Sequence, residues 1–119
     1  MAAATRGVYL VLALLMIGLG LVHLAATFAL FDALTGRAVW FASAGVAIVL
    51  TGVLNLLARA YGAAARGVRW AAIGANLVMT VFAALAGVAG ASSDAQLAAI
   101  VGLMAAATLL SMLPARLSG

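Results

Sequence analysis

Four long apolar segments constrain this chain more than any other feature of its sequence. They cover residues 8–31, 38–58, 70–90 and 95–113, and no Asp, Glu, Lys or Arg lies inside any of them. Each is close to the 20 or so apolar residues that a helix needs to cross a bilayer. The segments are continuously apolar rather than alternating, and an open sheet would leave backbone groups unpaired in lipid. We therefore predict an all-α integral membrane four-helix bundle.

Composition and linker length support the same architecture. Hydrophobic residues make up 69% of the chain and charged residues 7%, whereas soluble domains carry about 25% charged residues. Intrinsic disorder is excluded as well, because it requires low hydrophobicity. The segments are joined by short linkers, and helices joined in this way are antiparallel neighbours. Residues 1–119 are thus expected to form one transmembrane domain with up-down-up-down topology.

The arginines predict how the bundle is oriented. The chain has six arginines and no lysine. Arg37 lies on one side of the bundle, and five lie on the other: Arg6, Arg59, Arg66, Arg69 and Arg116. The positive-inside rule then places both termini in the cytoplasm, most simply at a bacterial inner membrane. The bilayer is the expected partner of these arginines, and nucleic acid is not, because there is no soluble fold with a clustered basic face.

Aromatic residues at the segment ends fit interfacial belts. The expected inner group is Tyr9, Tyr61 and Trp70, and the outer group is Phe28, Phe31, Trp40 and Phe41. Amphipathic rings of this kind gather at membrane–water interfaces.

Several kinds of chemistry lack their parts. There is no cysteine, which removes thiolate metal sites, iron–sulfur clusters and thiol nucleophiles. The segments contain no carboxylate pair and no serine–histidine–acid set. We predict that the chain is not an enzyme, with no catalytic residue and no metal site; the cofactor is left unassigned.

Polar residues within the segments fall into two layers when depth is counted at about 1.5 Å per residue. The inner layer contains Thr51, Asn55, Asn76, Thr108 and Ser111, and the thin outer layer contains His23, Thr27 and Ser43. Asn55 and Asn76 have two interpretations. They are either interhelical hydrogen-bonding groups, each bond contributing roughly 0.6 kcal/mol, or residues that line a substrate site.

His23 is the one ionisable residue deep in a segment, and such a residue is a functional-site hypothesis by default. A neutral imidazole can ligate haem iron, bond a quinone carbonyl or carry a proton. The alternative is a structural histidine that bonds Ser43, Thr27 or a backbone carbonyl. The candidate ligand-binding residues are His23, Ser43, Asn55 and Asn76.

Two resemblances bear on the architecture. The size and four-span plan resemble the small multidrug resistance transporters, which use a glutamate in the first span; this chain has no glutamate. The first-span histidine, followed by Val39-Trp40-Phe41, Gly45, Gly52 and Asn55, is similar to small uncharacterised bacterial four-helix inner-membrane proteins. That second resemblance implies fold and location, and no activity.

Three functions follow as hypotheses. The first is a non-catalytic accessory or assembly subunit of a membrane complex, which would need a strip of Gly and Ala facing outward; the candidates are Gly18 and Gly20, or Ala98, Gly102 and Ala106. The second is a binder or carrier of a lipid, quinone, haem or other hydrophobic molecule at His23. The third is a homo-oligomeric transporter coupled to protonation of His23. The expected partners are thus a larger complex or further copies of the chain.

Overall fold

The computed structural model describes residues 2–90 and 93–113 and is all-helical over them. Its four helices are α1 (Ala2–Leu30), α2 (Gly36–Tyr61), α3 (Arg66–Val88) and α4 (Asp94–Met112). All four are long and apolar enough to cross a membrane. The prediction of an all-α chain with four long apolar helices is therefore confirmed over the described residues.

Side-chain caps mark the start of two of the helices. Thr35 accepts a hydrogen bond from the backbone N–H of Ala38 and starts α2. Ser93 and Gln96 form a reciprocal capping box that starts α4. These side chains satisfy backbone N–H groups that have no partner within the helix. The linker between α2 and α3 is shorter than the apolar segments imply: α3 begins at Arg66 without a side-chain cap, and the non-helical stretch covers only residues 62–65.

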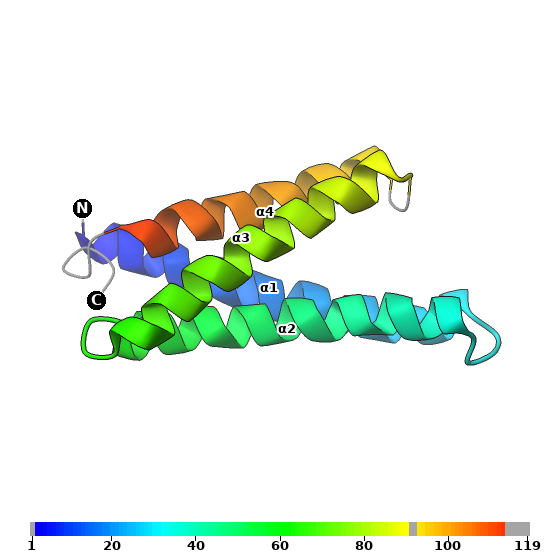
Figure 1. Cartoon of the computed structure of the whole chain (residues 1–119), viewed down its shortest axis with the longest axis horizontal. Coiled ribbons are helices and arrows are strands. Elements are labelled where there is room, and N and C mark those ends of the chain that lie inside the picture. The colour runs from blue at the N-terminus through cyan, green and yellow to red at the C-terminus, as the bar shows by residue number, and fades with distance from the viewer. Residues whose placement is uncertain (1, 91–92, 114–119) are drawn as a thin grey trace.

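The helices are arranged as two hairpins, α1–α2 and α3–α4 (Figure 1). The hairpins lie together at the end where α1 begins and where α2 connects to α3. They diverge toward the other end, which carries the α1–α2 connection. We call these the closed end and the open end of the bundle.

Glycines allow α1 and α2 to pack closely. A Cβ atom added at Gly20 would lie 2.6 Å from Val49 Cγ2 and 2.8 Å from the carbonyl oxygen of Gly45. A Cβ at Gly52 would lie 2.7 Å from Ile17 Cγ1. Small residues permit this kind of backbone approach between membrane helices. Gly20 is therefore part of the α1–α2 contact, and its proposed place in an outward-facing strip is wrong.

Most large apolar side chains point outward, as in a membrane protein. Leu50, Phe82 and Leu109 are 62%, 64% and 68% exposed, respectively. Inside, Met16, Ile48, Met104 and Ala107 form a small core with contributions from α1, α2 and α4. Small residues also remain on the outer face of α4, where Ala98 and Gly102 are exposed.

Candidate functional site

A buried polar cluster joins three helices near the closed end. The amide of Asn55 on α2 donates to Oδ1 of Asn76 on α3 at 2.7 Å, and the amide of Asn76 donates back to Oδ1 of Asn55 at 2.8 Å. Tyr9 on α1 donates its hydroxyl to Oδ1 of Asn55 at 2.6 Å. Both asparagines are fully buried. The interpretation of Asn55 and Asn76 as interhelical hydrogen-bonding groups is confirmed.

The fourth helix joins this cluster through its last turns. The amide of Asn76 lies 3.4 Å from Oγ of Ser111, and the Oγ1 atoms of Thr80 and Thr108 are 3.5 Å apart. Thr108 and Ser111 are also buried. The inner polar layer expected from residue depth is thus brought together across α2, α3 and α4, and Tyr9 connects it to α1.

Two residues of the closed end have roles that the sequence reasoning missed. Tyr9 was expected at the membrane interface, but it is only 2% exposed because its hydroxyl reaches the asparagine pair. From the sequence alone, Arg69 contributes only to the predicted orientation of the bundle in the membrane. Its guanidinium donates to the backbone carbonyls of Met112 (3.1 Å) and Leu113 at the end of α4. A basic side chain there satisfies carbonyls that the helix leaves unpaired.

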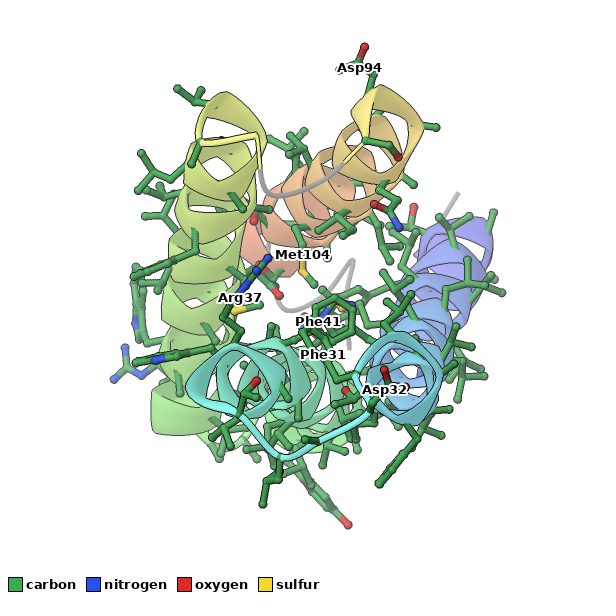
Figure 2. All side chains as sticks on the ribbon, turned by 90° about the vertical axis from the view of Figure 1, so that its right-hand side faces the viewer. Phe31, Asp32, Arg37, Phe41, Asp94 and Met104 are labelled. Carbon is green, nitrogen blue, oxygen red and sulfur yellow. The ribbon has the colours of Figure 1, made fainter. Side chains whose placement is uncertain are left out.

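A cleft of about 500 Å³ lies between the two hairpins. Residues from every helix line it. His23 comes from α1, Phe31 directly follows α1, and Ile100 comes from α4. The residues of α2 include Arg37, Trp40, Phe41 and Ile48, and those of α3 include Met79, Phe82 and Ala83. Phe31 and Phe41, expected in the outer aromatic belt, point instead into the interior between the helices (Figure 2).

His23 is the only one of the four candidate ligand-binding residues that lines the cleft. Its ring stacks on Phe41, with ring centroids 3.9 Å apart and an interplanar angle of 16°. Its Nε2 atom is buried and has no hydrogen-bond partner among the described residues. A buried polar atom without a partner is rare and costs free energy.

Ser43 does not accompany His23, so the alternative in which His23 bonds Ser43 is wrong. Ser43 is exposed and donates to the carbonyl of Trp40 at 2.8 Å. It follows Phe41 by two residues, which is about 200° around a helix, so the two side chains leave α2 in nearly opposite directions. Thr27 likewise donates to a carbonyl, that of His23 itself, at 3.2 Å.

The chain therefore separates two polar regions: a satisfied cluster at the closed end, and, toward the open end, a cleft in which Nε2 of His23 has no partner among the described residues. The first can hold helices together. The second offers space and an available hydrogen-bonding group, which are the features of a ligand site. No known protein family, curated protein or solved structure matches this chain.

Proposed function

We propose that this protein is a non-catalytic membrane protein that binds one hydrophobic small molecule in the cleft between its hairpins. The observation that carries the proposal is the cleft itself, about 500 Å³ in volume and lined by all four helices. Ligand pockets span roughly 300–1,000 Å³ and combine mainly apolar walls with a few placed polar groups. Here His23 and Arg37 are the placed groups, and the other lining residues are aromatic, aliphatic or methionine.

The proposal includes a bacterial inner-membrane location with up-down-up-down topology. Arg59, Arg66 and Arg69 lie near the closed end of the bundle, and Arg37 lies near the open end. The positive-inside rule then puts the closed end in the cytoplasm, so the cleft opens toward the outer side. Because the chain has no native cysteine, Ala64→Cys and Leu34→Cys test this cleanly. An impermeant thiol reagent added outside intact cells should label only Leu34→Cys; the reverse pattern contradicts the orientation.

Occupancy of the cleft can be tested with two neighbouring alanines of α3. Ala83 lines the cleft, whereas Ala84 is exposed on the outside of the helix. We expect Ala83→Phe to fill the cleft and abolish binding, and Ala84→Phe to leave binding unchanged. In native mass spectra of mildly extracted protein, the unsubstituted chain should carry a bound small molecule, seen as extra mass beyond the 11.8 kDa of the chain. Its presence in both variants, or its absence from the unsubstituted chain, contradicts the proposal.

A second candidate is the accessory subunit of a membrane complex, supported by the outer face of α4. Ala98 and Gly102 remain exposed there, and a Cβ at Gly102 would meet nothing within 4 Å. Small residues on an outer face allow another helix, from a partner or a second copy, to approach. Gly102→Phe should then abolish an associated chain in native mass spectra. Gly74→Phe on α3, which also faces open space, is the control that should retain it.

A further inference from the structure

We propose that the ligand of the cleft is a single-chain oxyanion amphiphile, with its carboxylate or phosphate head between Arg37 and His23. Its hydrocarbon chain then extends along α2 toward Ile48. This inference rests on the proposed function and adds the chemical class of the ligand.

Arg37 supplies an uncompensated positive charge at the open end of the cleft. Its side chain extends from α2 toward the space between the hairpins, while Asp94 points away from that space (Figure 2). Within residues 2–90 and 93–113 no hydrogen bond or salt bridge engages Arg37, and no carboxylate lines the cleft. A guanidinium matches a carboxylate or phosphate in bidentate geometry. Charge complementarity therefore selects an anionic head.

The lining residues of α2 order the cleft from polar to apolar. Arg37, Phe41, Ala44 and Ile48 are spaced by three or four residues and lie on one face of the helix. At 1.5 Å per residue, Ile48 lies about 16 Å deeper than Arg37. Ile48 is buried, and Met79 of α3 also lines the cleft. This gradient suits a molecule with a charged head and an extended chain.

His23 adds a second polar contact next to Arg37. The stacked Phe41 holds the imidazole beside the face of α2 that carries Arg37. Phe41 follows Arg37 by about 6 Å along the helix. A head group at this level can therefore reach both Arg37 and the His23 ring that stacks on Phe41. A ligand oxygen accepting a hydrogen bond from Nε2 would satisfy the atom that has no partner within the described chain. The carbonyls of a neutral quinone could accept hydrogen bonds, but they would leave the positive charge of Arg37 uncompensated.

Trp40 provides a reporter for the test because it lines the cleft, whereas Trp70, on α3, does not. In Trp70→Phe protein reconstituted into nanodiscs, Trp40 is the only tryptophan. The probes are chain-brominated amphiphiles of equal length with a carboxylate, a phosphate or a neutral alcohol head, because bromine quenches nearby indole fluorescence. Saturable quenching, absent in Ala83→Phe and retained in Ala84→Phe, reports the cleft.

We expect at least one anionic probe to bind about tenfold more tightly than the alcohol, as charge-assisted hydrogen bonds allow. The tighter of the two anionic probes then shows whether the natural ligand has a carboxylate or a phosphate head. Arg37→Gln should reduce the preference to about twofold or less, and Arg66→Gln, at the closed end, should leave it unchanged. Among the described residues Arg37 makes no hydrogen bond or ion pair, so this substitution breaks none.

Two results overturn the inference while the proposed function stands: saturable binding with equal affinity for the alcohol and both anions, or an anion preference that survives Arg37→Gln. Quenching that never saturates with any of the three probes overturns both. His23→Phe refines the assignment, because it keeps a ring against Phe41 and removes Nε2. A several-fold weaker anion affinity is expected; unchanged affinity removes His23 from the site.

Discussion

Asn55 and Asn76 pair through both of their side-chain amides, each donating to the other across the contact between α2 and α3. The two side chains are fully buried, and Asn55 also donates to the carbonyl of Thr51 at 2.8 Å. This arrangement satisfies both amides where the hairpins meet. The closed end is thus held by hydrogen bonds between α2 and α3.

Replacing one member of the pair should destabilise the bundle more than its own contacts suggest. Asn76→Leu leaves Asn55 without its partner, and a buried group left unsatisfied costs about 1–3 kcal/mol. The double variant Asn55→Leu/Asn76→Leu should cost less than the sum of the single variants, because neither amide remains. Unfolding in mixed detergent with increasing dodecyl sulfate measures both. Additive costs would show that the pair is not coupled.

Tyr9→Phe should lower the free energy of unfolding by about 1 kcal/mol, the usual contribution of a hydrogen bond. The substitution removes only the hydroxyl that donates to Asn55. Tyr61→Phe is a matched control, since Tyr61 is 61% exposed, and its stability should not change. Equal effects in the two variants would argue against a buried role for Tyr9.

Arg69→Gln should loosen the end of α4. The guanidinium holds the carbonyls of Met112 and Leu113, and its Nε lies 3.4 Å from the carbonyl of Ser111. We expect faster amide hydrogen exchange in the last two turns of α4, by about tenfold, because hydrogen bonds from a charged donor are worth about 1.5–3 kcal/mol. Arg66→Gln should leave that exchange unchanged. Protection of α4 that is identical in the two variants would contradict the role.

Two glycines of α1 should respond oppositely to alanine. Gly20→Ala places a Cβ against Val49 and the Gly45 carbonyl, and overpacking of this kind costs about 1–3 kcal/mol. Gly18 faces open space, so Gly18→Ala should be neutral or stabilise the helix by up to about 1 kcal/mol. The unfolding assay described for the asparagines distinguishes them. A tolerated Gly20→Ala would mean that α1 and α2 pack less closely than described.

The amino-acid sequence alone determined the number of helices, their apolar character and the depth of their polar residues. These are local properties: hydropathy and length set each helix, and a fixed rise per residue places Asn55 and Asn76 at a common level. Because a buried amide in lipid needs a partner, that level made interhelical hydrogen bonding one of two interpretations, and the structure decided for it.

Only the tertiary structure decided which way each residue faces. Nearly every face of these helices is apolar, so no amphipathic pattern fixes their rotation about the long axis. The sequence therefore could not separate Gly20 from Gly18, or place Ser43 outside and Arg37 over a cleft. Rotation and splay follow from close packing between residues distant in the chain, such as Gly20 with Val49 and Tyr9 with Asn55. Those contacts put Tyr9 in the core and leave His23 beside an open cleft.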